Sequence, residues 1–291
     1  MSKSLKLASK WVRSVNSLVR FAAYGKHPRR GALLAAFVRL HLTILLYATV
    51  NRPLRSFSLL GRRVQFANSH TFSFLLMELF LEESYGECDP PPATILDLGS
   101  NIRMSILLFK SLWPACRVFG VEASPEIFAM LEQNVRGLPE VTVVNRAVSD
   151  RAGTISFYST PDSLMGSTNM LRGGSVGTAV EATPLSEFVS GPVDLLKIDI
   201  EGSEIAAFAE LGASGKMSLI REMRIEYHHH IPGECHSLAA FLERLERHGF
   251  GYELAAALPD DYGGMQDVVI RARRIESARI PLHSADECGA R

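Results

Sequence analysis

The sequence predicts an α/β protein with an open, mainly parallel β-sheet that is covered by helices on both faces. From Ala93 onward, short apolar runs alternate with segments whose apolar residues recur at helical spacing. This alternation is typical of parallel strands that are joined by helices. The chain has 291 residues, 47% of them hydrophobic, which is enough for one large domain with an appendage or for two small domains.

Pattern and composition divide the chain into three regions. Residues 1–88 are predicted to form a basic, mainly helical extension, in which "SFSLLGRRVQFAN" indicates a short hairpin with Gly61 at its turn. Residues 89–275 carry the regular alternation and are predicted to form the main domain. Residues 276–291 are predicted to be a disordered tail.

The elements of the main domain follow the proline stop "CDPPP" in a regular order. Strands are predicted at "ATILDLG", "RVFGVEA", "EVTVVNRAV", "GTISFYS", "PVDLLKIDIEG", "SLIREMRIEYH", "YELAAAL" and "MQDVVIRAR". Helices are predicted at "MSILLFKSLW", "SPEIFAMLEQNV", "SEIAAFAEL" and "SLAAFLERLERHGF". The second of these has Ser124 as its N-cap and Pro125 in its first position. No internal repeat is present.

The Gly- and Ser-rich residues 160–180 are predicted to form a mobile loop between two of these strands. Such a loop could close over a substrate, to which Leu164, Met165 and Met170 would offer adaptable apolar contacts. An ordinary disordered surface loop is the alternative interpretation.

The charge of the chain is zero overall but unevenly distributed. Residues 1–77 contain 13 of the 31 Lys and Arg residues and no Asp or Glu, so the remainder has 18 basic against 31 acidic residues. Such a basic segment is expected to meet something anionic. We favour the acidic remainder of the same chain, and a membrane surface or a nucleic acid are the alternatives.

The most hydrophobic stretch, residues 31–50, is long enough to span a bilayer, but Arg39 and His41 lie in its middle. A buried or interfacial helix is therefore favoured over a span, and peripheral attachment to anionic lipid is the alternative. No signal-peptide pattern is evident, and the four cysteines form no CxxC pair. We expect a cytoplasmic protein, with peripheral membrane contact left open, and no structural zinc site or disulfide framework.

Polar residues follow five of the predicted strands. Ligands of open α/β sheets bind beyond the carboxyl ends of the strands. The candidate segments for a functional site are therefore Asp97–Asn101, Glu122–Ser124, Asn145–Ser149, Asp199–Glu204 and Glu226–His230. Glycine at the first strand end lets the backbone turn tightly beside a ligand, and an acidic residue at the second suits the two hydroxyls of a ribose.

The charge at the first strand end indicates which cofactor could bind there. The motif GxGxxG is absent, and Asp97 would place a carboxylate where a pyrophosphate lies in dinucleotide-binding proteins. Two such anions repel each other. A cofactor that has a ribose and a cationic sulfonium but no phosphate fits better, and S-adenosylmethionine is such a molecule.

Four segments resemble the FkbM family of S-adenosylmethionine-dependent methyltransferases. They are "ILDLGSNIRMS", "VFGVEASPEIFAMLEQN", "VVNRAVSDRAGTISFY" and "VDLLKIDIEGSE", which is followed by "IEYHH". The resemblance covers roughly residues 72–256. It implies a class I methyltransferase fold, which is Rossmann-like and has a seven-stranded sheet with an antiparallel last strand. It also implies methyl transfer to a small-molecule hydroxyl on a sugar or a secondary metabolite.

The resemblance implies roles for individual residues. Those that would contact the cofactor are Asp97, Gly99, Ser100 and Asn101 at its methionine end, Glu122 with Ala123 at the ribose, and Ala147 at the edge of the adenine. Asp199, at the end of the fourth strand, would face the reacting methyl group. Lys197 lies within that strand, and we expect it to pair with a neighbouring carboxylate in a structural role.

One position departs from the family pattern D-x-G-x-N-x-G-x-[ST], because Arg103 replaces the last glycine. We expect Arg103 in the first turn of the following helix, where it counts among the cofactor-site residues. Its guanidinium could bind the carboxylate of the cofactor in a bidentate pair. It could instead obstruct the pocket, since a glycine of close approach has no spare room, or it could point to solvent.

Methyl transfer to an alcohol benefits from a general base near the hydroxyl. The candidates are Asp199, Glu226 and His228, of which we favour His228 because histidine has a suitable intrinsic pKa. His229 and His230 are expected on the solvated surface. A metal is not expected, since no strict ligand spacing is present, although Asp199, Glu201 and Glu226 could offer oxygen ligands.

Three hypotheses about function follow. The first is an active O-methyltransferase that acts on a small molecule. The second is a non-catalytic scaffold in which Arg103 impairs cofactor binding, and the third is a membrane-associated methyltransferase that acts on a glycolipid. A nucleic-acid acceptor is not expected, because "DIEG" stands where an NPPY-like motif would follow the fourth strand.

Overall fold

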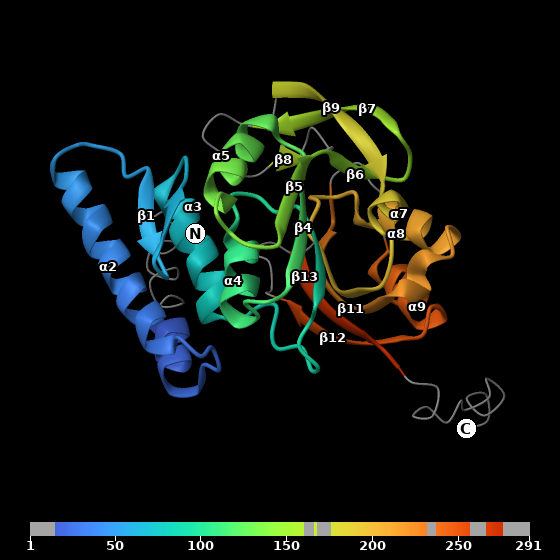
Figure 1. Cartoon of the computed structure of the whole chain (residues 1–291), viewed down its shortest axis with the longest axis horizontal. Coiled ribbons are helices and arrows are strands. Elements are labelled where there is room, and N and C mark those ends of the chain that lie inside the picture. Colours follow the sequence, from blue (N-terminus) through green and yellow to red (C-terminus); the bar gives the residue numbers. More distant parts are fainter. Residues whose placement is uncertain (1–14, 160–165, 168–175, 232–236, 257–265, 276–291) are drawn as a thin grey trace.

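The computed structural model describes residues 15–159, 166–167, 176–231, 237–256 and 266–275. Its centre is a seven-stranded sheet in the order β12-β13-β11-β10-β3-β4-β5 (Figure 1). The strands are β3 (Thr94–Leu98), β4 (Arg117–Glu122), β5 (Val141–Asn145), β10 (Val193–Ile198), β11 (Ile220–His229), β12 (Phe250–Ala256) and β13 (Gln266–Arg274). Strand β13 runs antiparallel to both of its neighbours, whereas the pairs among β5, β4, β3, β10 and β11 are parallel. The sheet is therefore mixed, and its antiparallel last strand agrees with the predicted class of fold.

Helices cover both faces of this sheet. On one side lie α4 (Met104–Leu112) and α5 (Pro125–Val135), and on the other α7 (Leu185–Phe188), α8 (Glu204–Ala213) and α9 (Leu238–Arg247) (Figure 1). Successive side chains of a strand point to opposite faces of the sheet, so each strand contributes to two hydrophobic cores. In β3, Ile95 belongs to the cluster under α4 and α5, and Leu96 belongs to the cluster under α8 and α9. Ser124 caps α5 by accepting a hydrogen bond from the main-chain N–H of Ile127 at 3.3 Å, as predicted.

A second, four-stranded sheet has the order β6-β9-β7-β8. Its strands are β6 (Ala147–Ser149), β7 (Gly153–Ser159), β8 (Gly166–Ser167) and β9 (Val176–Pro184). The prediction of one strand at "EVTVVNRAV" is corrected, because β5 and β6 from this segment join different sheets. Strand β7 is confirmed as a strand, but it lies outside the main sheet.

The prediction of a mobile loop at residues 160–180 is also wrong in part. Strands β8 and β9 occupy the described residues of this stretch, and β9 pairs with β7 from Val176 opposite Ser159 to Ala182 opposite Gly153. The glycine content of this stretch favoured a loop prediction, and the alternation of β9 was overlooked. In β9 the inward residues Val180 and Ala182 are buried. Leu164, Met165 and Met170 lie outside the described residues.

The N-terminal extension packs on the α4 side of the main sheet. Its elements are a helical segment at residues 15–24, α2 (Arg30–Thr49), β1 (Ser56–Leu59), β2 (Arg62–Gln65), α3 (Ser69–Leu76) and a π-helical turn, Met77–Leu81. The predicted hairpin is confirmed as β1 and β2, and Gly61 at its turn has φ +83°. Buried residues of the extension such as Leu40 and Phe72 belong to the same hydrophobic cluster as Ile95 and Ile106.

Arg103 differs from its predicted place in the first turn of a helix. It precedes α4 with a left-handed backbone, φ +95° and ψ 1°, and its side chain is only 1% exposed. The guanidinium Nη1 donates a hydrogen bond to the main-chain carbonyl oxygen of Asn134 at the end of α5. Burial lowers the pKa of Arg103 to about 10, and the charge of Arg62 adds to this effect. The family pattern has glycine here because glycine adopts this conformation without steric cost.

Replacing Arg103 by glycine or by alanine separates the backbone cost from the side-chain contacts. Both Arg103→Gly and Arg103→Ala remove the buried guanidinium, but only glycine relieves the left-handed conformation. We expect the glycine variant to have a free energy of unfolding about 1 kcal/mol greater than the alanine variant. Urea denaturation measures this difference, and equal stability of the two variants would contradict the backbone explanation.

Candidate cofactor site

The site begins at a tight bend between β3 and α4. Gly99 has φ +80°, and a Cβ atom there would lie 1.8 Å from the carbonyl oxygen of Asp199. The main-chain N–H groups of Gly99 and Ser100 both donate to the carbonyl oxygen of Val121 at 2.9 Å. The ends of β3, β4 and β10 thus meet around a residue that must be glycine for reasons of both conformation and space.

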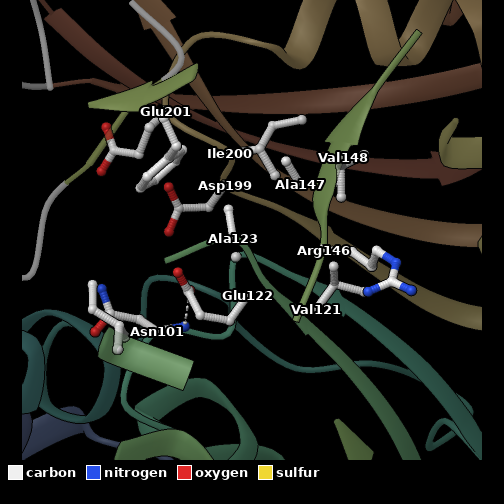
Figure 2. A pocket seen from close by; sticks show the side chains of 13 residues that line it. Asn101, Val121, Glu122, Ala123, Arg146, Ala147, Val148, Asp199, Ile200 and Glu201 are labelled. Atoms are coloured by element: carbon white, nitrogen blue, oxygen red, sulfur yellow. Dashed lines mark hydrogen bonds between the residues drawn. The ribbon is translucent and has the colours of Figure 1, made fainter. Parts of the chain in front are cut away.

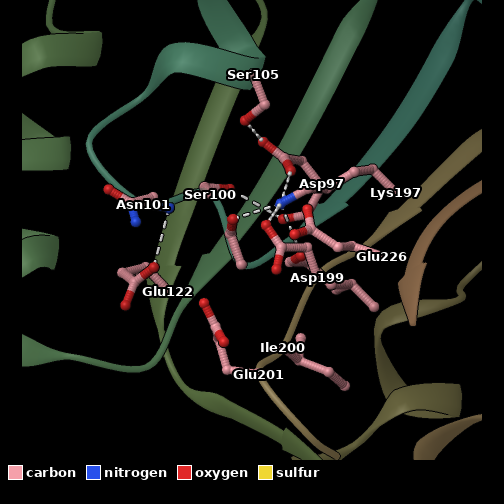
Figure 3. Close-up of polar contacts among 12 residues, drawn as sticks. Asp97, Ser100, Asn101, Ser105, Glu122, Lys197, Asp199, Ile200, Glu201 and Glu226 are labelled. Atoms are coloured by element: carbon pink, nitrogen blue, oxygen red, sulfur yellow. Dashed lines mark hydrogen bonds and ion pairs between the residues drawn. The ribbon is translucent and has the colours of Figure 1, made fainter. Parts of the chain in front are cut away.

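Lys197 on β10 holds these strand ends together from beneath (Figure 3). Its side chain is 2% exposed, and Nζ lies 3.1 Å from Asp199 Oδ2 and 3.5 Å from Asp97 Oδ1. Nζ also donates to the carbonyl oxygen of Gly99 at 2.6 Å. Burial alone would lower the pKa of Lys197, but Asp199 and Asp97 outweigh it and hold that pKa above its usual value. The expected pairing of Lys197 with a neighbouring carboxylate is observed.

Asp97 and Ser100 lie behind the bend and are not among the residues that line the pocket. Asp97 is fully buried and its Oδ2 accepts a hydrogen bond from Ser105 Oγ at 2.6 Å. Ser100 Oγ donates to the carbonyl oxygen of Asp97 at 2.9 Å. Their side chains therefore support the bend, and their expected contact with the cofactor stays a prediction. Arg103 is not a lining residue either, and it is neither a solvent-facing side chain nor an obstruction of this pocket.

Glu122 ends β4 and faces the pocket from the side of Asn101. Its two carboxylate oxygens accept hydrogen bonds from the main-chain N–H groups of Asn101 at 2.9 Å and Ser124 at 2.8 Å. Burial raises the pKa of Glu122 to about 7, although these two hydrogen bonds act in the opposite direction. Asn145 Nδ2 donates to the carbonyl oxygens of Glu122 and Ala123 and so fixes the backbone on both sides of the carboxylate.

The pocket lies beyond the carboxyl ends of the strands, as the sheet topology requires (Figure 2). Six residues predicted for the cofactor line it: Gly99, Asn101, Glu122, Ala123, Ala147 and Asp199. Of the seven further lining residues, four lie in the predicted candidate segments, namely Arg146, Val148, Ile200 and Glu201, and three were not predicted, namely Val121, Ile127 and Phe157. Val121 directly adjoins the predicted Glu122 in the sequence, but Phe157 comes from β7, and no local pattern indicated that this strand reaches the site.

A second polar cluster surrounds His228 near the end of β11. His228 is 2% exposed, and its Nδ1 lies 2.7 Å from Glu204 Oε1. Its Nε2 lies 3.5 Å from Glu201 Oε2, and carboxylate oxygens of three further residues lie within 4.0 Å: Asp199, Glu226 and Asp267. The structure thus brings together all three predicted catalytic residues. As expected, His230 is exposed, whereas His229 is half-buried.

The carboxyl groups of this cluster differ in their protonation. Burial, followed by the charge of Asp199, holds the pKa of Glu226 well above its usual value. Burial would also raise the pKa of Glu204, but the charge of His228 and the hydrogen bonds from His228 and Gly202 lower it. Glu204 is therefore a carboxylate that can accept a hydrogen bond from Nδ1–H of His228. The candidate segment that begins at Asp199 includes Glu204, but the sequence indicated no role of its own for this residue.

A metal ion is one possible occupant of the same cluster. Asp199, Glu226 and His228 each offer a ligand atom, and these atoms lie within 4.8 Å of one another. Mixed carboxylate and imidazole ligands suit several divalent metals. The oxygen ligands considered from the sequence were Asp199, Glu201 and Glu226, so His228 takes the place of Glu201 in the observed group. These three side chains can lie together without an ion.

The raised pKa of Glu122 predicts a pH dependence of stability. A carboxyl group with pKa 4.5 in the unfolded chain and about 7 in the fold binds its proton more tightly when folded. Its contribution is therefore favourable at low pH and is lost as the pH rises from 4.5 through 7. Relative to Glu122→Gln, the wild type should lose up to about 3 kcal/mol of unfolding free energy over this range.

Urea denaturation of both proteins between pH 5 and 8 tests this expectation. The difference between the two curves isolates the titration of Glu122 from that of other groups. A difference that is constant with pH would show that the Glu122 carboxylate ionises as easily in the fold as in the unfolded chain.

Comparison with known proteins agrees with the sequence resemblance. Among curated proteins, the chain is 35% identical over 104 residues to the AMB antimetabolite synthetase AmbE of Pseudomonas aeruginosa, with 34% of this chain and 5% of AmbE covered. It is 25% identical over 171 residues to the methyltransferase sdnD of Sordaria araneosa, with 45% of this chain and 66% of sdnD covered. The chain thus spans less than two thirds of either relative.

Solved structures and a family model complete the comparison. An FkbM methyltransferase from Methylobacillus flagellatus KT has 12% identity and a TM-score of 0.43, covering 83% of this chain and 62% of that one. The N-terminal domain of EvdMO1 with SAH bound has 12% identity and a TM-score of 0.46, covering 81% and 97%. The family model "Methyltransferase FkbM domain" matches residues 97–252, more than half of the sequence. The protein therefore belongs to the FkbM methyltransferase family, whose cofactor is S-adenosylmethionine.

Proposed function

We propose that this chain transfers the methyl group of S-adenosylmethionine to a hydroxyl of a small molecule, such as a sugar or a secondary metabolite. The observation that carries the proposal is the pocket beyond the Gly99 bend, into which the carboxylates of Glu122 and Asp199 both point (Figure 2). S-adenosylmethionine supplies an electrophilic methyl group on a positively charged sulfur. A pocket with carboxylates favours that charge and disfavours a phosphorylated nucleotide.

The two ends of the pocket suit the two ends of this cofactor. Glu122 is held by main-chain N–H groups in an orientation that leaves it facing the pocket, where it can accept hydrogen bonds from the ribose hydroxyls. The side chains of Ala147 and Phe157 provide apolar surface for the adenine. Asp199 is 24% exposed and is anchored by Lys197, which places a fixed carboxylate near the sulfonium end.

His228 is the residue that we propose as the general base. When the Nδ1–H of a neutral His228 donates to Glu204, the lone pair of the imidazole is on Nε2. Nε2 lies 4.0 Å from Asp199 and 3.5 Å from Glu201, two residues that line the pocket. Nε2 would accept the proton of the acceptor hydroxyl, and the bound cofactor would supply the electrophilic methyl group and leave as S-adenosylhomocysteine. Glu204 acts through His228 and is a positioning residue.

Binding of S-adenosylmethionine tests the cofactor site directly. Isothermal titration calorimetry should show binding to the wild type and an affinity at least about tenfold weaker for Glu122→Ala, because the ribose hydroxyls lose a charged acceptor. Glu126→Ala, an exposed glutamate one turn away, should bind as the wild type does. Arg103→Gly should also leave the affinity unchanged, since the guanidinium contacts Asn134.

A wild-type protein that fails to bind S-adenosylmethionine would favour the non-catalytic scaffold. Tighter binding by Arg103→Gly than by the wild type would restore the idea that the arginine obstructs the cofactor.

Turnover of the His228 and Glu204 variants tests the proposed base. Release of S-adenosylhomocysteine can be followed with a panel of free sugars and hydroxylated metabolites as acceptors. With a responsive acceptor, His228→Ala should lower kcat by about 10²–10³-fold and Glu204→Gln by about tenfold or more, with cofactor affinity unchanged in both. The exposed Glu253→Gln serves as a control with wild-type kcat.

Two results would contradict this assignment. Full activity of His228→Ala would exclude His228 as the base. Loss of wild-type activity in EDTA with recovery in Mg²⁺ would assign Asp199, Glu226 and His228 to a metal ion instead of to direct proton transfer.

A further inference from the structure

Helix α2 lies at the outer edge of the molecule (Figure 1). It exposes a row of apolar side chains. Val38, Leu42 and Leu45 follow one another at helical spacing and are 50%, 62% and 63% exposed. Leu46 beside them is 62% exposed, and Val50 just after the helix is 58% exposed. We call these five residues the α2 stripe. A surface helix of a soluble protein normally turns polar residues outward, so this stripe marks a contact with something outside the described chain.

The opposite side of α2 is already occupied by the protein itself. Leu33, Phe37 and Leu40 are buried in the hydrophobic cluster that α2 shares with α3 and β1. The helix is therefore apolar on both sides, and only its inner side has a partner among the described residues. By length and composition it could cross a membrane, but its inner side is committed to the fold.

The two basic residues within the apolar sequence of α2, Arg39 and His41, are directed toward the protein. Arg39 donates to the carbonyl oxygen of Ser58 and lies 4.7 Å from the centre of the Phe57 ring. His41 Nε2 lies 3.2 Å from Ser73 Oγ on α3. Because both side chains bind to β1 and α3, they do not interrupt the α2 stripe.

The N-terminal extension that carries the α2 stripe is basic. Exposed arginines of the extension bind main-chain carbonyl oxygens, as Arg29 does at Leu60, Arg30 at Gly25 and Arg62 at Gly137, so their charges are not compensated by these contacts. Lys26 Nζ forms an ion pair with Glu87 Oε2 at 3.1 Å. This pair is one contact of the expected kind between the basic residues 1–77 and the acidic rest of the chain. The charges of Arg29, Arg30 and Arg62 are thus available to an outside anion.

We propose that the α2 stripe docks on an anionic lipid membrane, with α2 lying in the interface. Apolar side chains would enter the boundary between headgroups and acyl chains, while the surrounding arginines and lysines bind the anionic headgroups. A second copy of this chain fits less well, because a symmetric contact through α2 would bring two basic extensions together.

Vesicle flotation of the full chain tests this proposal. The wild type should float with vesicles of phosphatidylcholine and phosphatidylglycerol, bind pure phosphatidylcholine at least about tenfold more weakly, and lose affinity as salt is raised. The double variant Leu42→Glu/Leu45→Glu should bind the anionic vesicles at least about tenfold more weakly than the wild type. Leu254→Glu, which changes a 48% exposed leucine on β12, is the matched control and should float as the wild type does.

The proposal is overturned if the wild type does not bind anionic vesicles or if the double variant binds them equally well. Light scattering provides the other outcome: a dimer that the double variant dissociates, without vesicle binding by the wild type, would assign the α2 stripe to a second copy. Both substitutions lie on the exposed side of α2, and an unchanged circular dichroism spectrum would confirm that the double variant folds.

Discussion

The site depends on one buried cation, the ammonium group of Lys197. It lies between Asp97 and Asp199 and also binds the carbonyl oxygen of Gly99, so a single side chain connects the ends of β3 and β10. A buried ion pair gains little net stability from its charges, but removing one partner leaves an uncompensated charge that costs about 3–5 kcal/mol. The three groups are therefore mutually dependent, because Lys197 pairs with both Asp97 and Asp199 and fixes the position of each carboxylate.

The negative character of the pocket follows from this arrangement. Lys197 is the buried cation at the bend, and its hydrogen-bonding capacity is used by main-chain and carboxylate oxygens beneath the pocket. On the open side, Asp199, Glu201 and Glu122 line the pocket, with Arg146 as the basic residue at its edge. Arg146 lies 3.1 Å from Glu181, which compensates its charge. These carboxylates would favour a cationic sulfonium in this pocket, whereas a pyrophosphate would meet like charges.

The features that sequence predicted correctly are those that depend on local chemistry. Backbone geometry predicts the tight bend at Gly99 and the helix cap at Ser124. The family resemblance, which rests on motifs of consecutive residues, implies the antiparallel last strand. Arg103 could not be placed in this way, because the group that binds it, the carbonyl oxygen of Asn134, is distant in sequence. The same is true of Glu204, whose partner His228 comes from another strand. In β9, the Gly- and Ser-rich composition around it suggested a loop, but the strand contains only one glycine, Gly177, and pairs with β7 along most of its length.

Asn134 shows why the extension and the site are parts of one structure. Its side chain accepts a hydrogen bond from the N–H of Gln65 in β2 and donates to the carbonyl oxygens of Gln65 and Ile102. Its own carbonyl oxygen accepts from Arg103. The hairpin of the extension is thereby joined to the loop that carries Asn101, whose N–H binds Glu122 in the pocket. Since each of these contacts satisfies a polar group at a largely buried position, the loop geometry that the cofactor needs depends on the extension being docked.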